Sequence, residues 1–253
     1  MNFDDPIGQA FLQLDIPLPR QGPGSAAATR AVLESVPELP AAPRIIDAGC
    51  GSGASTLVLA EALPSASIVA VDVLDLLLER LATASKAAGV DARVEVRRES
   101  MLDVQEPPES IDLIWCEGAI YTFGIERALR TWRPLLRPNG CVVFSDACWW
   151  ARERSPELVR FWAANYPDMR DEADVLALLE PLGFTPVATR RLEREGWLTD
   201  YYEPLARRCA ELRPRADPIL AQVIANAEAE IASFQANQDQ CGYTFFVAQR
   251  GPG

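Results

Sequence analysis

Short apolar runs alternate with amphipathic segments along the first 146 residues. Runs such as IVAVDV and CVVFSD are apolar at nearly every position, which is typical of parallel strands covered on both faces. Leu74, Leu77, Leu78 and Leu81 instead recur at helical spacing and form one stripe. The pattern predicts strands at 44–48, 67–72, 92–98, 111–116 and 141–146, and helices at 54–63, 74–88 and 124–136. The predicted fold class is therefore α/β, with a doubly wound, mostly parallel sheet.

The pattern becomes mostly helical after Asp146. Helices are predicted to open at Ser155 and Asp171, each at a residue that caps a helix N-terminus. A strand follows at about 184–192, residues 198–238 are helical with a break near Pro214, and the last strand is 242–249. We expect the final strand pair to form an antiparallel edge and the helical insert at about 193–240 to fold over the sheet as a cap.

The N-terminal region precedes the alternating pattern. Residues 1–24 have no helical or strand period and are expected to be irregular, whereas Ser25 is placed to cap a helix that runs to about Val36. This organisation predicts an N-terminal extension over residues 1–40, which forms part of an active-site cover, and a main domain over residues 41–253.

Composition narrows the classes of function. The net charge of −12 disfavours nucleic acid and anionic membranes as partners, although Arg190, Arg191 and Arg194 form one local basic cluster. Histidine is absent, which excludes imidazole-based catalysis and the commonest zinc ligand. The six cysteines form no CxxC pair and are expected to be reduced and structural. The acidic N-terminus is unlike a signal peptide, and no apolar run approaches the roughly 20 residues of a membrane span, so a cytoplasmic protein is expected.

The most informative segment is RIIDAGCGSGAS, residues 44–55, in which a strand leads through a glycine-rich loop into a helix. Glycines let the backbone approach a ligand, and the free amides at a helix start face it. The run also fits GxGxxA, so a nicotinamide dehydrogenase is an alternative. Asp72 ends the second strand, where a carboxylate can accept both ribose hydroxyls of either cofactor. Asp47 discriminates, because a carboxylate beside the loop suits a cationic sulfonium or ammonium better than a pyrophosphate.

Two further segments, IDLIWCEGAIYTFG and RTWRPLLRPNGCVVFSD, follow at fixed spacing. Together with the glycine loop they make residues 22–150 resemble the class I methyltransferases, in particular the small-molecule branch that includes ubiquinone and menaquinone biosynthesis enzymes. The resemblance implies a seven-stranded sheet with a C-terminal antiparallel strand, and S-adenosylmethionine as the cofactor. It further implies a set of cofactor contacts: Asp47, Gly49, Gly51 and Gly53 around the methionine part, Asp72 on the ribose, Val73 beside the adenine, Ser100 and Met101 at the adenine edge, and Glu117 facing the sulfonium.

Methyl transfer from a sulfonium is a single in-line displacement, which requires alignment and exclusion of water but no metal. An oxygen or protonated amine as the acceptor would need a base, for which Glu117, Tyr121 and Asp146 are the candidates. Other residues are expected to bind the acceptor: Trp149, Trp150 and Tyr201. The segment Gly22–Ser25 and the insert near Trp197, Tyr201 and Tyr202 are expected to form a mobile cover.

The sequence therefore predicts a methyltransferase that acts on a small molecule. The identity of the acceptor and a choice between monomer and homodimer stay open. One alternative is a binding module that senses the cofactor without turnover. A second is a nicotinamide-dependent reductase, but its Tyr-x-x-x-Lys pair is excluded because Ala82 precedes the only lysine, Lys86, at that spacing.

Overall fold

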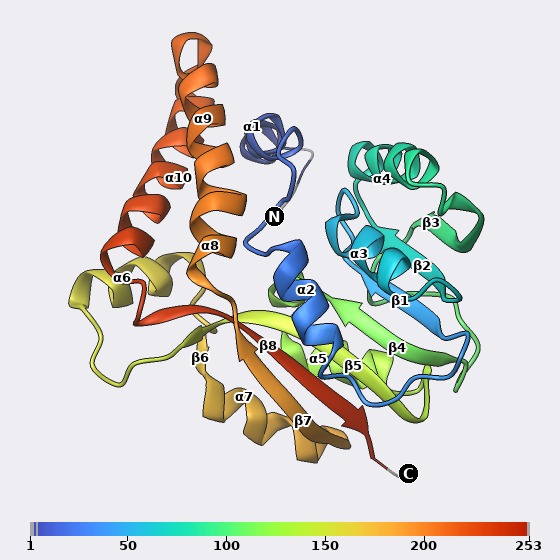
Figure 1. Cartoon of the computed structure of the whole chain (residues 1–253). Coiled ribbons are helices and arrows are strands. Elements are labelled where there is room, and N and C mark those ends of the chain that lie inside the picture. The colour runs from blue at the N-terminus through green and yellow to red at the C-terminus, as the bar shows by residue number, and fades with distance from the viewer. Residues whose placement is uncertain (1–2, 4, 252–253) are drawn as a thin grey trace.

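A computed structural model of the chain describes residue 3 and residues 5–251 (Figure 1). The strands form one sheet in the order β3-β2-β1-β4-β5-β8-β7, and a two-residue strand, β6, pairs with β5 outside this path. The strand bounds are β1 Arg44–Ala48, β2 Ser67–Asp72, β3 Val94–Arg98, β4 Ile111–Cys116, β5 Leu136–Trp149, β6 Arg170–Asp171, β7 Phe184–Arg191 and β8 Cys241–Arg250. The predicted doubly wound, Rossmann-like α/β fold is confirmed.

The last strand, β8, is antiparallel to both of its neighbours, β5 and β7, whereas the other described pairings are parallel. The expected antiparallel edge is confirmed: the final pair, β8 and β7, closes one side of the sheet, with β7 as its edge strand. Pairing with β8 from Cys141 to Trp149 accounts for the extension of β5 beyond residue 146, whereas at the start of the strand Leu136 pairs with Ile111 of β4.

Helices cover both faces of the sheet (Figure 1). Their bounds are α1 Pro6–Asp15, α2 Ala26–Leu33, α3 Ala54–Ala62, α4 Asp75–Ala87, α5 Ile125–Trp132, α6 Pro156–Asn165, α7 Glu172–Leu179, α8 Arg194–Trp197, α9 Glu203–Leu212 and α10 Pro218–Ala236. One core cluster joins the sheet to α1, α2, α3, α4 and α8–α10, and the other joins it to α5 and α7. A π-helical turn over Leu198–Tyr202 connects α8 to α9.

Two predicted boundaries were wrong for identifiable reasons. The segment 1–24 is not irregular throughout, because Asp5 caps α1 by accepting from the Gly8 amide at 2.8 Å and Pro6 occupies its first turn. The helix predicted over 124–136 ends at Trp132, because Pro134 cannot continue it. Residues 1, 2, 4, 252 and 253, at the outer ends of the two expected regions, lie outside the described residues.

The cap over the sheet is built from both ends of the chain. α1 packs against α10 and α9, and in Figure 1 these three helices stand together beyond the carboxyl ends of the central strands. The insert predicted at about 193–240 corresponds to α8, the π-helical turn, α9 and α10. The chain therefore places N-terminal and C-terminal helices on the side of the sheet where ligands bind in folds of this type.

Candidate functional site

The glycine-rich loop is fixed to the neighbouring strand. The amides of Gly49 and Cys50 both donate to the Val71 carbonyl, at 2.9 and 3.0 Å. A Cβ on Gly49 would lie 2.5 Å from Cβ of Ala119, and a Cβ on Gly53 would lie 2.1 Å from Cδ1 of Leu81. Both glycines also have positive φ, so no L side chain fits either place without strain. Close packing against the loop after β4 and against α4 therefore accounts for these two glycines.

Asp72 at the end of β2 joins the glycine loop to the start of α4. Its Oδ2 accepts from the Gly51 amide at 3.0 Å, and its Oδ1 accepts from the amides of Val73 and Leu74 at 2.7 and 3.0 Å. An ionised carboxylate offers about four lone-pair positions. Three are used by the backbone, so one remains, on Oδ2, for a ligand hydroxyl.

Asp47 at the end of β1 is fully buried. Its Oδ2 accepts from the hydroxyls of Thr56 and Ser55 at 2.6 and 3.0 Å, whereas Oδ1 has no partner among the described residues. Burial and the charges of Glu117 and Asp72 together raise the pKa of Asp47 to about 7, although the two hydroxyls oppose them. The unsatisfied oxygen marks a position where a donor would be favourable.

Glu117 follows β4, and all three donors to its carboxylate are side chains. Its carboxylate forms an ion pair with Arg20 and accepts from the Thr29 hydroxyl at 2.9 Å and from the Trp115 indole N–H at 3.2 Å. Only 2% of the Glu117 side chain is exposed, and Nε of Arg20 is buried without a partner. The site therefore holds a carboxylate beside a guanidinium that still has a free donor.

The segment of residues 16–24, here called the N-terminal strap, crosses the glycine loop. Gln21 Oε1 accepts from the amide and the hydroxyl of Ser52 at 3.1 and 2.8 Å. Arg80 on α4 donates to the carbonyls of Ile16 and Leu18. The sequence predicted part of this cover at Gly22–Ser25 but missed Arg20 and Gln21. No local signal marks them, because their partners lie far away in the chain.

The strap also meets the C-terminal cap. The Gly24 amide donates to the Gly196 carbonyl at 3.1 Å, which places the strap beside Trp197. The two segments expected to form a cover are thus in contact with each other. Their mobility stays a prediction.

The residues expected around the adenine lie along the ends of β2 and β3. Val73 is 46% exposed, which is unusual for an apolar residue and leaves its side chain accessible to a planar ligand. Ser100 is half-buried, and its hydroxyl accepts from the Leu102 amide at 3.3 Å. Met101 is buried and its carbonyl accepts from the Trp132 indole at 2.7 Å. Their roles toward a cofactor stay predictions.

On the acceptor side, Asp146 and two tyrosines form a chain. Asp146 Oδ2 accepts from the Tyr166 hydroxyl at 2.9 Å, and the rings of Tyr166 and Tyr121 lie 6.0 Å apart. Burial raises the pKa of Asp146 to about 7, which the hydrogen bonds from Tyr166 and Ala147 partly oppose. Tyr166, at the end of α6, was not among the residues expected from the sequence.

The two tryptophans expected to bind the acceptor already have protein partners. Trp149 is buried, and the guanidinium of Arg154 lies 4.5 Å from its ring centroid. The Trp150 indole donates to the Thr244 hydroxyl at 2.9 Å, and Arg191 lies over its ring at 4.9 Å. Tyr201, the third expected residue, is buried within the cap. Contact of any of them with an acceptor stays a prediction.

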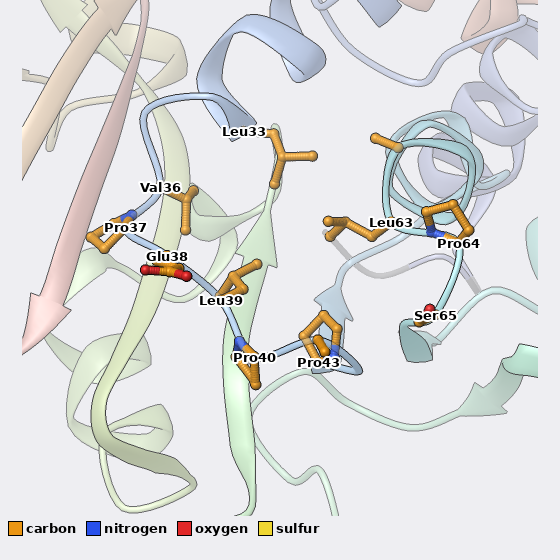
Figure 2. A pocket seen from close by; sticks show the side chains of 12 residues that line it. Leu33, Val36, Pro37, Glu38, Leu39, Pro40, Pro43, Leu63, Pro64 and Ser65 are labelled. Carbon is orange, nitrogen blue, oxygen red and sulfur yellow. The ribbon is translucent and has the colours of Figure 1, made fainter.

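The hollow in Figure 2, of about 290 Å³, lies elsewhere. It is lined by the connection from α2 to β1 and by the end of α3, including Leu33, Pro43 and Leu63. Pro43 immediately precedes β1, so this hollow lies at the amino end of the strand, opposite the glycine loop. None of the polar residues described above lines it, and it is not the candidate site.

No helix of the described residues is long and apolar enough to cross a membrane. Within the same part of the chain, no cluster of three or more metal-binding side chains occurs, and all six cysteines are buried thiols.

Comparison with known proteins connects this geometry to methyl transfer. Residues 45–140 match a family model described as a methyltransferase domain. Phosphoethanolamine N-methyltransferase 1 of Arabidopsis thaliana is 27% identical over 191 residues, which are 74% of this chain and 36% of that protein. Ribosomal RNA large subunit methyltransferase G of Pseudomonas savastanoi pv. phaseolicola is 29% identical over 119 residues, 47% of this chain and 32% of that protein. The chain spans between 23% and 36% of the length of the curated relatives that it matches.

The whole fold also has a solved counterpart. A methyltransferase from Geobacter sulfurreducens in complex with S-adenosylhomocysteine superimposes with a TM-score of 0.80 at 19% identity, covering 95% of this chain and 97% of that one. This protein therefore has the class I S-adenosylmethionine-dependent methyltransferase fold, as the resemblance implied. The match to a methyltransferase domain supports S-adenosylmethionine, the cofactor that the resemblance implied.

Proposed function

We propose that this protein is a methyltransferase that transfers the methyl group of S-adenosylmethionine to a small molecule. The observation that supports this most strongly is the set of polar groups at the carboxyl ends of β1, β2 and β4. Asp47, Asp72 and Glu117 face the glycine loop from three neighbouring strands, and the Arg20 guanidinium is paired with Glu117. In parallel sheets of this kind, ligands bind at that edge.

The residues present fit the cofactor in charge. Its methionine part carries one ammonium and one carboxylate, and the Glu117–Arg20 pair offers one group of each opposite sign. Arg20 Nε is buried and lacks an acceptor, which a ligand carboxylate would supply. Glu117 would hold the ammonium, the free position on Asp72 would accept one ribose hydroxyl, and Val73 would lie against the adenine. When bound, the cofactor supplies the electrophilic methyl group.

The contacts of Glu117 favour a positioning role over a catalytic one. Three donors already fix its carboxylate, so moving a proton onto it would disrupt the ion pair with Arg20. Asp146 is better suited to accept a proton from an acceptor, because its pKa of about 7 lies near neutral pH. Tyr166 donates to this carboxylate and its ring meets that of Tyr121, so the two tyrosines would orient the carboxylate or the acceptor. We therefore keep Tyr121 and Asp146 as the candidates for proton removal.

Two observations support a small molecule rather than RNA, on which three of the matched relatives are named as acting. The net charge of −12 opposes a phosphate backbone. The strap and the α8–α10 cap also contact each other over the site, through Gly24 and Gly196, which favours an acceptor small enough to be enclosed. The likeness to the quinone-biosynthesis branch remains part of this proposal.

Ligand-induced stabilisation tests the proposal. S-adenosylhomocysteine at 100 times its Kd should raise the stability by about 2.7 kcal/mol, whereas NADH should have no effect. Stabilisation by NADH alone would contradict the proposal. Turnover distinguishes an enzyme from a cofactor-sensing module: conversion of S-adenosylmethionine should accelerate with at least one compound in a panel of amines, phenols, quinols and thiols. Binding without any acceleration across that panel would favour the module.

A further inference from the structure

Two carboxylates lie together under the cap, outside the residues discussed for the cofactor. Asp15 is the last residue of α1 and is 6% exposed, and none of the described residues donates a hydrogen bond to its carboxylate or forms an ion pair with it. Glu230 lies on α10, against which α1 packs, and accepts from the Tyr202 hydroxyl at 2.9 Å. An unpartnered, nearly buried carboxylate beside a second acid is unfavourable unless it is protonated or a cation is present.

The charges near this pair do not balance. Burial and the charge of Glu230 together raise the pKa of Asp15 to about 8, although Arg80 opposes them. Burial also raises the pKa of Glu230, which the Tyr202 hydroxyl partly opposes. Arg80 lowers the pKa of Asp15, but its guanidinium donates to the carbonyls of Ile16 and Leu18 rather than to the carboxylate. The pair therefore has a deficit of positive charge.

Aromatic rings surround the same region. Trp197 is 1% exposed, stacks on Phe234 with ring centroids 4.4 Å apart, and meets Tyr243 edge-on at 5.0 Å. Tyr201 and Tyr202 in the π-helical turn lie 5.3 Å apart. The Trp197 indole N–H is buried without a partner. Ring faces beside carboxylates form a favourable environment for an organic cation.

The cluster is next to the proposed methyl-transfer site. A Cβ on Gly118, the residue after Glu117, would lie 3.6 Å from the Tyr243 ring. Burial, followed by the charges of Asp15, Glu230 and Asp146, raises the pKa of Tyr121 to about 12, although 48% of its surface is exposed. Protein therefore surrounds most of the Tyr121 side chain, although solvent still reaches part of it. Tyr121 is thus close enough to the acid pair and to Asp146 for their charges to act on its hydroxyl.

We propose that Asp15 and Glu230 bind a positively charged amino group of the methyl acceptor, together with the neighbouring aromatic side chains of Trp197, Tyr201 and Tyr202. The proposal rests on the proposed function, because it assigns part of the acceptor to one wall of that site. It concerns recognition of the acceptor and does not require the amino nitrogen to be the atom that is methylated.

Binding to the full-length protein loaded with S-adenosylhomocysteine tests the proposal. The probes are phenethylamine, spermidine and choline, each compared with a neutral counterpart: N-acetylphenethylamine, spermidine acetylated on all three nitrogens, and 3,3-dimethyl-1-butanol for choline. At least one cation should bind tenfold or more tightly than its counterpart. Asp15→Asn and Glu230→Gln should each remove most of that preference while changing the Kd of S-adenosylhomocysteine less than twofold.

Glu228→Gln is the matched control, because Glu228 lies on the same helix but forms an exposed ion pair with Arg213. It should leave the preference unchanged. Calorimetry in buffers of different ionisation enthalpy should also detect proton release when the cation binds at pH 7, and Asp15→Asn should abolish it.

The outcomes separate the two proposals. Failure of S-adenosylhomocysteine to bind would overturn the proposed function. Normal binding of that ligand, with no probe preferred over its neutral counterpart or with a preference that survives both substitutions, would overturn the cation site alone.

Discussion

Asp72 offers the sharpest test of the proposed cofactor site, because its two carboxylate oxygens accept different numbers of backbone hydrogen bonds. Oδ1 accepts from two backbone amides, and Oδ2 accepts only from Gly51, which leaves one position for a ribose hydroxyl. The sequence alone predicted bonds to both hydroxyls. Asp72→Asn keeps an oxygen for Val73 and Leu74 but places an amide N–H₂ where Oδ2 was, so it loses the Gly51 bond and the ribose bond together.

The magnitudes follow from these counts. One charge-assisted hydrogen bond contributes about 1.5–3 kcal/mol. Loss of the ribose bond should therefore weaken S-adenosylhomocysteine binding by roughly 10- to 100-fold. Asp72→Asn loses one backbone bond and should also lower the free energy of unfolding by about 1.5–3 kcal/mol, and Asp72→Ala should lower it by up to about three times that, because it removes all three backbone bonds.

Calorimetric titration with S-adenosylhomocysteine and urea unfolding measure the two effects on the same samples. Because Asp72→Asn and Asp72→Ala both lack the Oδ2 acceptor, their affinities should fall by similar factors while their stabilities differ. A wild-type Kd in Asp72→Asn would remove Asp72 from the cofactor site. Affinity losses that track the stability losses would show that Asp72 acts only by holding the loop.

Two further predictions concern stability. Gly53→Ala places a Cβ 2.1 Å from Leu81 at positive φ and should lower the free energy of unfolding by roughly 2–4 kcal/mol. Gly89→Ala is also at positive φ but has nothing within 4 Å, so it should cost roughly 1 kcal/mol, and equal losses in urea unfolding would refute the steric explanation. Burial raises the pKa of Asp146 from 3.8 to about 7, so the folded state binds more protons than the unfolded state and stability should fall as pH rises through that window. Asp146→Asn should reduce the slope of the unfolding free energy against pH by up to about 1.4 kcal/mol per pH unit, and an unchanged slope would contradict the raised pKa.

The sheet could be predicted because its determinants are local. Apolar strand runs, the glycine loop and Asp72 lie within 29 residues, Arg44 to Asp72, and each carries a recognisable pattern. The errors arose where a local rule was overlooked or a distant partner decided the outcome. Asp5-Pro6 is a helix start in the sequence itself, and Pro134 marks a helix end. The length of β5, by contrast, depends on pairing with β8, about 100 residues later, which no local pattern encodes.

The site residues divide in the same way. Asp47, Asp72 and Glu117 follow strands, and parallel strand ends must meet at one edge, so their proximity follows from topology. Arg20 could not be predicted as the partner of Glu117, because 97 residues separate them and a single arginine in an apparently irregular segment carries no signal. The number of donors on each carboxylate is also invisible in sequence, yet it decides what Asp72 and Glu117 can still bind.

Apart from Arg20, the part of the site proposed for the cofactor is covered by the family model, whereas the part proposed for the acceptor amine lies outside it. The family model ends at residue 140, and it covers the glycine loop and the strand ends but none of α1, the strap or α8–α10. Asp15, Tyr201 and Glu230 come from those uncovered segments and meet only because α1 packs on α10. A cofactor common to many enzymes can be held by a shared loop, whereas the acceptor differs between enzymes and must be read by side chains that differ too. The selectivity of this protein should therefore reside in the two ends of its chain.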